Sequence, residues 1–346
     1  MNFFTLKELL MHVRFIVLTV AWAFLSGCVN RSEPVEEGPD TPVLRTVSLQ
    51  LNWFPEAEHG GFYAADVHGF FAEEGLHVEL LSGGPNVPVV QLLDSGKVDF
   101  AVLNADRVVL GRSAQADVVA VMATMQDSPR CIMVHRQSGI SNLQDLKNVT
   151  LALGNGPTFV EYMTLHLPLE NVETVTYTGS IAPFLANERF AQQAYVFSEP
   201  YLAQQQGADP LNLMVSEIGF NPYASLLTTT SGTCAQDPEL VTKLVRASLR
   251  GWKQYLADPQ KTNELIDQLN PDMNPQALSY GVQQITRLCR PGGETSLPLG
   301  SMTRERWQTL IDQLVETKLV APGSVAVEET FSNGFLANGQ ASDGEG

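Results

Sequence analysis

The chain has 346 residues, of which 44% are hydrophobic and 17% are charged, and its formal net charge is −17. This length and composition are typical of a globular protein with enough residues for two lobes, each with its own core. With only 21 Lys and Arg the chain offers no basic patch, which excludes nucleic acid and an anionic membrane surface as expected binding partners.

The first 27 residues are predicted to be a lipoprotein signal peptide. An apolar run covers residues 15–25, which is shorter than the roughly 20 residues that span a bilayer and suits a signal-peptide core. Ser26-Gly27-Cys28 follows it and resembles a bacterial lipobox, in which Cys28 is lipidated and becomes the new N-terminus. An ordinary cleaved signal with a chance cysteine is the alternative, and Met11 is a second possible start. Residues 28–44, rich in Pro and Glu, are expected to be a flexible tether. The protein is therefore expected outside the cytoplasmic membrane, anchored to lipid.

Short strands then alternate with short helices, which predicts an α/β lobe with a largely parallel sheet. The predicted strands cover residues 47–54, 77–83, 97–103 and 117–125. The predicted helices cover residues 60–75, 87–96 and 105–115.

A second α/β lobe follows the extended segment 130–140. Its predicted strands cover residues 149–154, 172–178, 193–198 and 212–218, with helices from about 157, over 181–187 and over 201–207. A last extended segment, 223–231, precedes four amphipathic helices, whose apolar residues recur at helical spacing over 238–258, 259–269, 275–288 and 303–319.

This element order predicts two α/β lobes joined by two crossing strands, with a cleft between them that closes on a ligand. We assign residues 45–130 and 230–336 to lobe one and residues 131–229 to lobe two. Residues 337–346 are expected to be a disordered tail.

Several motifs carry a resemblance to a known family. They are LNWFPEAEHGGFYAADVHGFFAEEGL at 51–76, SGKVDF at 95–100, SGI at 138–140 with DLK at 145–147, and SEPY at 198–201. From about residue 47 to 335, the chain resembles the periplasmic-binding-protein family of thiamine-pyrimidine precursors, whose relatives bind sulfonates, nitrate or riboflavin-like compounds. The resemblance implies the periplasmic-binding-protein type II fold, a monomer without cofactor, and an ABC permease and ATPase as partners.

Ring side chains are concentrated where the first strand gives way to a helix. Trp53 and Tyr63 offer flat faces on which a ring could stack, at roughly 0.5–1.5 kcal/mol beyond area burial. Packing in the core is the alternative for both. His59 is a ligand contact or a structural cap. Glu56 could face a ligand amine, although Glu56 and Glu58 are expected to be solvated.

Further candidates follow other predicted strands, because ligands of open α/β sheets bind at the carboxyl ends of the strands, beside helix N-termini. Gly84 lies in a Gly-Gly turn whose amides could bind an anion, unless it is a plain tight turn. Glu199 could bind an amino group or ring N–H, with a salt bridge across the hinge as its alternative. The remaining candidates are Asn104, Asp106, Asn155 and Tyr223.

No catalytic constellation or metal-spaced cluster is found. The family that the chain resembles has a fungal branch that includes a pyrimidine phosphate synthase, with a Lys and a His in the loop after the third predicted strand. In this chain the corresponding loop reads LNADRVV at 103–109 and contains neither residue. Cys131 is expected to be buried and inert. An oxidising compartment permits a disulfide, and Cys234 and Cys289 are expected to pair.

The expected function is binding of a small heteroaromatic ligand for an ABC importer. Trp53, Tyr63 and Glu199 suit a flat nitrogen heterocycle. An aliphatic sulfonate or nitrate is the alternative ligand, and ligand sensing for a signalling system is the alternative role.

Overall fold

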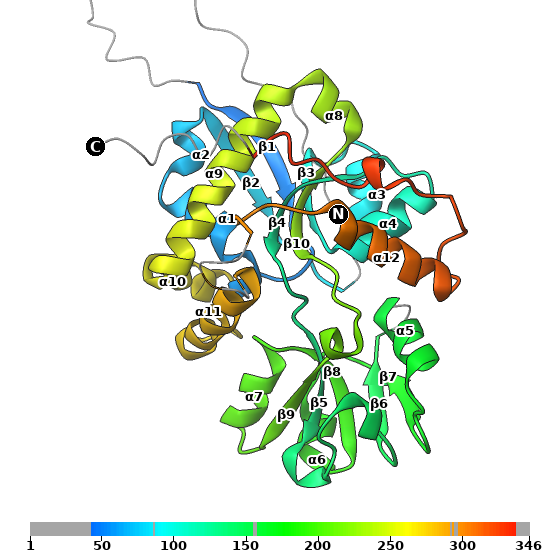
Figure 1. The fold of residues 1–346 in the computed structure, drawn as a ribbon. Coiled ribbons are helices and arrows are strands. Elements are labelled where there is room, and N and C mark those ends of the chain that lie inside the picture. The colour runs from blue at the N-terminus through cyan, green and yellow to red at the C-terminus, as the bar shows by residue number, and fades with distance from the viewer. Residues whose placement is uncertain (1–42, 86, 155–157, 291–292, 294–296, 337–346) are drawn as a thin grey trace, which may run out of the picture. The chain divides into compact units, whose positions relative to one another are not determined.

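The computed structural model describes residues 43–85, 87–154, 158–290, 293 and 297–336. These residues form two lobes, each built on a five-stranded sheet with helices around it (Figure 1). This confirms the predicted α/β fold with two sheets. Cys28, the signal peptide and the C-terminal tail lie outside the described residues.

Lobe one is built on a mixed sheet in the order β2-β1-β3-β10-β4. β1 is parallel to β2 and to β3, whereas β10 is antiparallel to both β3 and β4. The strands are β1 (Arg45–Gln50), β2 (Leu76–Leu81), β3 (Phe100–Leu103), β4 (Val119–Met125) and β10 (Ala224–Thr229).

Helices cover both faces of this sheet, and a hydrophobic core lies under each layer. One layer contains α1 (Gly60–Val67), α2 (Phe70–Glu73), α9 (Pro238–Ala257), α10 (Gln260–Leu269) and α11 (Pro275–Cys289). The other contains α3 (Val89–Asp94), α4 (Ala105–Ser113) and α12 (Arg304–Glu316), and α8 (Ser231–Gln236) leads from β10 into α9. The four amphipathic helices predicted after residue 237 are all present.

The predicted helix over residues 60–75 is divided in two at Gly69. This glycine has φ of +75°, a left-handed conformation that L side chains rarely adopt and that ends a right-handed helix. α1 therefore stops at Val67, and α2 begins at Phe70.

α1 and α9 cross at a contact between small residues. A Cβ added to Gly251 of α9 would lie 2.1 Å from the carbonyl oxygen of Gly61 and 2.7 Å from the Cβ of Ala65, both on α1. A Cβ on Gly61 would lie 2.2 Å from the Trp252 ring. Glycine at these positions lets the two backbones approach closely enough to bury the first helix against the sheet.

Lobe two is built on a second mixed sheet in the order β7-β6-β8-β5-β9. β6 is parallel to β7 and β8, and β5 is antiparallel to β8 and β9. The elements are β5 (Arg130–His135), β6 (Thr150–Leu153), β7 (Glu173–Thr176), β8 (Phe190–Tyr195), β9 (Pro210–Met214), α5 (Thr158–His166), α6 (Ala182–Ala186) and α7 (Glu199–Gln205).

In each sheet one strand is antiparallel to the other four: β10 in lobe one and β5 in lobe two. The predicted parallel arrangement therefore holds for the other four strands of each sheet. β5 and β10 both start where the chain crosses between the lobes, whereas the other strands end at that boundary, so these two must run in the opposite direction. β10 also corrects the assigned lobe boundary. It pairs with β3 and β4, so residues 224–229 belong to lobe one and not to lobe two. Arg130, assigned to lobe one from the sequence, pairs with Tyr195 of β8 and belongs to lobe two.

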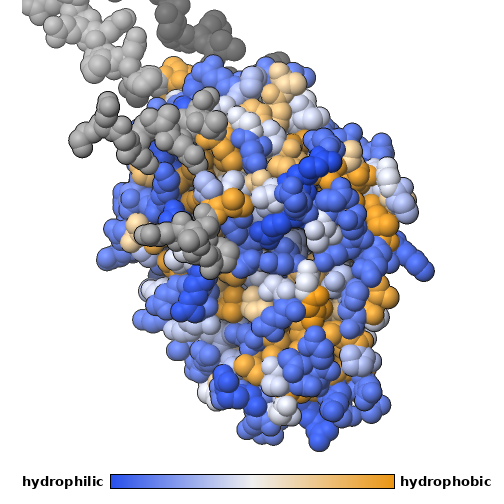
Figure 2. All heavy atoms as spheres, viewed as in Figure 1, coloured by the Kyte–Doolittle hydropathy of each residue, from blue (hydrophilic) through white to orange (hydrophobic). Residues whose placement is uncertain are grey.

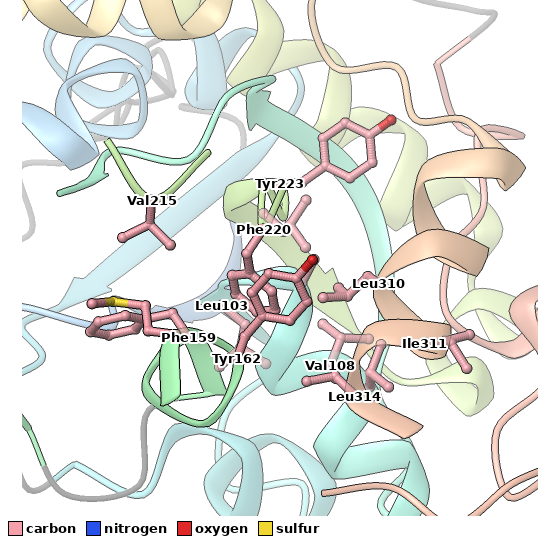
Figure 3. Packing of buried hydrophobic residues seen from close by; sticks show 14 of the residues in the cluster. Leu103, Val108, Phe159, Tyr162, Val215, Phe220, Tyr223, Leu310, Ile311 and Leu314 are labelled. Atoms are coloured by element: carbon pink, nitrogen blue, oxygen red, sulfur yellow. The ribbon is translucent and has the colours of Figure 1, made fainter. Parts of the chain in front are cut away.

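The core is not confined to the separate lobes. One hydrophobic cluster includes Leu310 and Leu314 of α12 in lobe one and Phe159 and Tyr162 of α5 in lobe two. Figure 3 shows these side chains beside one another, together with Phe220 of the second crossing segment. The outer face drawn in Figure 2 is mostly hydrophilic, with hydrophobic residues in separate areas.

Candidate functional site

The candidate site lies where the carboxyl ends of β1 and β3 in lobe one meet those of β6 and β8 in lobe two (Figure 1). A small cavity there, of about 50 Å³, is lined by side chains from both lobes and from the crossing segments. Its lining residues are Asn104, Asp106, Arg107, Ser128, Arg130, Thr158, Phe159, Tyr195, Phe220, Pro222, Tyr223 and Ala224. Three of them, Asn104, Asp106 and Tyr223, are among the residues predicted from the sequence.

Asn104 and Asp106 form hydrogen bonds across the lobe boundary. Asn104 Nδ2 donates to Tyr195 Oη at 2.9 Å. Thr158 Oγ1, at the first residue of α5, donates to Asp106 Oδ2 at 2.6 Å. Both polar groups therefore face the other lobe.

Ser225, which the sequence analysis missed, holds this corner of lobe one. It has φ of +51°, which is unusual for a residue other than glycine. Its backbone N–H donates to Asn104 Oδ1 at 3.1 Å, and its carbonyl accepts from Thr124 Oγ1 at 2.7 Å. Its hydroxyl donates to Glu58 Oε1 at 2.5 Å. Such a backbone conformation persists where its surroundings fix it, and it is more frequent at functional sites.

The segment after β1 presents two rings at the same end of the sheet. Trp53 is half-buried and Phe54 is 46% exposed, and their rings pack edge to face with centroids 5.5 Å apart. Gly83 donates its N–H to the Trp53 carbonyl at 2.9 Å. A Cβ on Gly84 would lie 3.3 Å from the Phe54 ring, so Gly84 lies beside this ring pair.

Glu56 and Glu58 are buried, so the expectation that they are solvated is wrong. Glu58 Oε1 accepts from Asn52 Nδ2 at 3.1 Å as well as from Ser225. Burial first, and then the charges of Glu58 and Glu199, raise the pKa of Glu56 well above its usual value. A raised pKa favours the neutral form of Glu56, in which a second carboxyl group can lie beside Glu58 without like-charge repulsion.

His59 and Tyr63 are core residues of lobe one. His59 is completely buried, and its Nε2 lies 2.8 Å from Asn52 Oδ1. Burial lowers the pKa of His59, which favours the neutral ring. Tyr63 is 3% exposed and belongs to the core between α1 and the sheet, where burial raises the pKa of its phenol to about 12.

Glu199 has both carboxylate oxygens engaged within lobe two. Tyr177 Oη donates to Oε1 at 2.7 Å, and the backbone N–H of Tyr195 donates to Oε2 at 2.8 Å. Across the boundary, Ser198 Oγ lies 3.5 Å from Glu56 Oε2. Glu199 therefore holds Tyr195 and Tyr177 in place. Among the described residues, it forms no salt bridge across the hinge.

Arg130, the first residue of β5, is also part of the site. Its guanidinium carbon lies 4.2 Å from the centroid of the Tyr195 ring and 4.9 Å from that of the Phe159 ring. Arg107, in the first turn of α4, is exposed and lines the same cavity. Neither arginine is a predicted site residue, because a lone arginine in a sequence carries no signal of what it faces.

The crossing segments are joined to each other and to α12. Asn221 donates to Asp127 Oδ1 at 2.8 Å and accepts from the N–H of Ser128 at 2.7 Å. Arg306 donates to the carbonyls of Gln126 and Asn221, and its guanidinium carbon lies 3.9 Å from the centroid of the Tyr223 ring. Tyr223 Oη in turn accepts from the N–H of Thr303, at the start of α12.

The expected disulfide is not formed. Cys131, Cys234 and Cys289 are all free. Figure 1 shows the reason: Cys234 belongs to α8 and Cys289 ends α11, and these helices lie at opposite ends of α9. Cys131 is buried, as expected.

Asn155, the remaining predicted site residue, lies outside the described residues. Among the residues that the structure describes, no cluster of His, Cys, Asp and Glu is arranged to hold a metal ion. None of the described helices is both long and apolar enough to cross a lipid bilayer.

The fold is that of the periplasmic binding proteins. The aliphatic sulphonate-binding protein SsuA of Escherichia coli superposes with a TM-score of 0.65 over 82% of this chain and 91% of that chain, at 13% identity. The nitrate-binding protein NrtA of Synechocystis PCC 6803 gives a TM-score of 0.61 over 87% of this chain and 89% of that chain, at 12% identity.

Within that fold, the chain belongs to the NMT1/THI5-like family, whose model matches residues 56–262. It is 24% identical to the riboflavin-binding protein RibY of Chloroflexus aurantiacus, over 86% of this chain and 88% of that protein. It is also 24% identical to the formylaminopyrimidine-binding protein of Halalkalibacterium halodurans, over 92% of this chain and 98% of that protein.

Enzymes are present among the relatives as well. The 4-amino-5-hydroxymethyl-2-methylpyrimidine phosphate synthase THI11 of Saccharomyces cerevisiae is 27% identical over 66% of this chain and 73% of that protein. The relatives thus include both binding proteins and synthases, and the two binding proteins cover more of the chain.

Proposed function

We propose that this protein is a lipid-anchored, extracytoplasmic solute-binding protein that delivers a small heteroaromatic ligand to an ABC importer. The observation that carries the proposal is the cavity at the carboxyl ends of both sheets, which side chains of both lobes line together. Such a site binds most tightly when the lobes hold the ligand from both sides, and the ligand then stabilises that arrangement.

The lining chemistry suits a ring with polar edges. Tyr195, Phe159 and Phe220 supply aromatic faces, and Asn104 supplies both a donor and an acceptor. Trp53 and Phe54 add a second ring pair at the end of β1. Relatives named for riboflavin and for formylaminopyrimidine support the same ligand class.

Binding requires the lobes to move. A cavity of about 50 Å³ holds one or two water molecules, whereas ligand pockets usually measure about 300–1,000 Å³. For the ligand to enter, the lobes would move apart about the crossing segments, and the hydrogen bonds from Asn104 to Tyr195 and from Thr158 to Asp106 would break. The lobes would then close on the bound ligand. The resulting closed complex is the form that a permease would recognise.

Binding without catalysis is favoured over synthase chemistry by the loop that enters α4. It reads LNADRVV over residues 103–109 and contains neither the Lys nor the His of the synthase pattern. His59 is buried and is not among the residues that line the cavity.

A thermal-shift screen of the full-length chain in detergent tests the proposal. Riboflavin, formylaminopyrimidine, thiamine, taurine and nitrate are compared. A ligand at a hundred times its Kd stabilises the folded state by about 2.7 kcal/mol, which a melting curve detects. We expect a shift with a heteroaromatic compound, and a shift with taurine or nitrate alone would contradict the ligand class.

A matched pair of variants then locates the site. Tyr195→Phe removes a hydroxyl that lines the cavity, and we expect it to weaken ligand binding about tenfold, which corresponds to about 1.4 kcal/mol. Tyr201→Phe makes the same change on α7, where the ring stacks on Tyr280 outside this cavity, and serves as the control. Equal affinities for both variants would place the ligand elsewhere.

A further inference from the structure

Two arginines line the cavity, one from each lobe. Arg107 reaches it from α4 of lobe one, and Arg130 reaches it from β5 of lobe two. Within the part of the chain that the structure describes, neither guanidinium forms a hydrogen bond or an ion pair with a side chain. In a protein of net charge −17, with 38 Asp and Glu, these two arginines bring positive charge to one cavity from both lobes.

The rings that flank Arg130 hold it without using its donors. Tyr195 and Phe159 contact the guanidinium by cation–π interaction, at 4.2 and 4.9 Å between ring centroid and guanidinium carbon. This interaction engages the positive charge, whereas the N–H bonds lie in the guanidinium plane and stay available to an acceptor. Arg130 is therefore oriented in advance, as a site for a planar or oxyanionic group requires.

The neighbouring carboxylates accept hydrogen bonds from groups other than the two arginines. Asp106 Oδ2 accepts from Thr158, and the two oxygens of Glu199 accept from Tyr177 and from the backbone of Tyr195. Burial raises the pKa of Tyr195 to about 12, and the positive charge of Arg130 acts in the opposite direction. An arginine that is half-buried with unused donors is costly, so an acceptor supplied by a ligand would offset that cost.

From this arrangement we infer that Arg130, assisted by Arg107, binds an anionic oxygen group of the ligand. The inference rests on the proposed function and makes the ligand class narrower: a heteroaromatic compound that carries a phosphate, sulfonate or carboxylate. The ring would occupy the aromatic part of the cleft, and the oxyanion would lie between the arginines of the two lobes. Arg130 is then a specificity-determining residue.

Riboflavin and riboflavin 5′-phosphate form a matched probe pair, because they differ only in the oxyanion. We expect the full-length chain to bind the phosphate ester at least tenfold more tightly in calorimetry, and this preference to fall below about twofold in Arg130→Gln. Raising the salt concentration should weaken the binding of the phosphate ester more than the binding of neutral riboflavin. Equal preference in wild type and variant, or tighter binding of the neutral compound, would overturn the inference.

Two further variants separate the oxyanion contact from a general effect. Arg130→Lys keeps the charge but loses the planar fork, so we expect an intermediate preference. Arg136→Gln removes an exposed arginine just after the same strand, paired with Asp209, and should leave the preference unchanged. If Arg130→Gln does not fold, Arg107→Gln, on the exposed rim, must reduce the preference by at least threefold for the inference to stand.

Inorganic phosphate and sulfate provide an arm that does not depend on the ring. We expect either anion at millimolar concentration to raise the melting temperature of the wild type and to have no such effect on Arg130→Gln. A phosphate shift without binding of any heteroaromatic compound would keep the oxyanion site and contradict the proposed function. Binding of a heteroaromatic compound that does not change in Arg130→Gln, together with no melting-temperature shift from either anion, would support the proposed function and contradict the oxyanion site.

Discussion

Glu56 precedes, and Glu58 lies in, the short helical turn Ala57–His59 after β1, and both are buried although carboxylates are usually exposed. With Glu199 they bring three carboxyl groups together at the lobe boundary. Glu58 receives two hydrogen bonds, while burial and the neighbouring charges raise the pKa of Glu56. This shift favours the neutral form of Glu56, which would reduce the like-charge repulsion among the three carboxyl groups.

This pKa shift makes stability depend on pH. The pKa of Glu56 is higher in the folded protein than its usual value of 4.5, so the folded state binds more protons than the unfolded state above that pH. Stability therefore falls as the pH rises from about 4.5 toward the folded-state pKa. Glu56→Gln replaces the neutral acid by a neutral amide of the same shape, and we expect it to remove this part of the slope.

Urea denaturation at pH 5 and pH 8 measures the effect. We expect the loss of unfolding free energy between the two pH values to be smaller in Glu56→Gln than in the wild type. Glu79→Gln, on the exposed side of β2, is the control and should keep the wild-type slope. An unchanged slope in Glu56→Gln would mean that Glu56 is ionised in the folded protein.

At the scale of elements, the crossing of α1 and α9 leaves no room for an added methyl group. Gly251→Ala would place its Cβ within 2.7 Å of backbone and side-chain atoms of α1, which cannot yield without moving that helix. We expect a loss of about 1–3 kcal/mol in the free energy of unfolding, because overpacking forces the two helices apart. Chemical denaturation measures it.

Gly232→Ala is the matched control for this prediction. It makes the same substitution in α8, where the nearest atom to the new Cβ would lie at 3.5 Å, an ordinary contact. Alanine is the better helix former, so this variant should be neutral or slightly stabilised. Equal effects of the two substitutions would contradict the close crossing of α1 and α9.

At the scale of the whole molecule, two crossing segments connect the lobes, and Arg306 of α12 forms hydrogen bonds with both segments. Arg306→Ala removes hydrogen bonds to the carbonyls of Gln126 and Asn221 and the contact with the Tyr223 ring. We expect a loss of about 1.5–3 kcal/mol in stability, the usual range for hydrogen bonds from a charged donor. Amide hydrogen exchange over residues 126–129 and 219–223 should become faster.

Arg304→Ala provides the comparison on the same helix. Arg304 is exposed and pairs with Glu328 at the surface, so its removal should cost much less stability than Arg306→Ala and leave exchange in the crossing segments unchanged. If Arg306→Ala behaved like Arg304→Ala, the two crossing segments would be held by their own hydrogen bonds through Asn221 and not by α12.

The amino-acid sequence by itself determined the element order and the family. The helices after residue 237 begin at local signals, such as Asp237 and Thr303, whose side chains accept from backbone N–H groups three residues on. Strands and helices follow hydrophobic periodicity, which depends on neighbours in the chain. Asn104 and Asp106 could be proposed as site residues because they follow a predicted strand, and Tyr223 because it lies near the return crossing.

Only the tertiary structure decided what surrounds each side chain. It buried Glu56, His59 and Tyr63, placed β10 in the sheet of lobe one, and separated Cys234 from Cys289. It also brought Arg107 and Arg130 to one cavity from different lobes. These outcomes depend on contacts between residues far apart in the chain, and such contacts are fixed by the packing of whole elements, on which the local pattern around each residue carries no information.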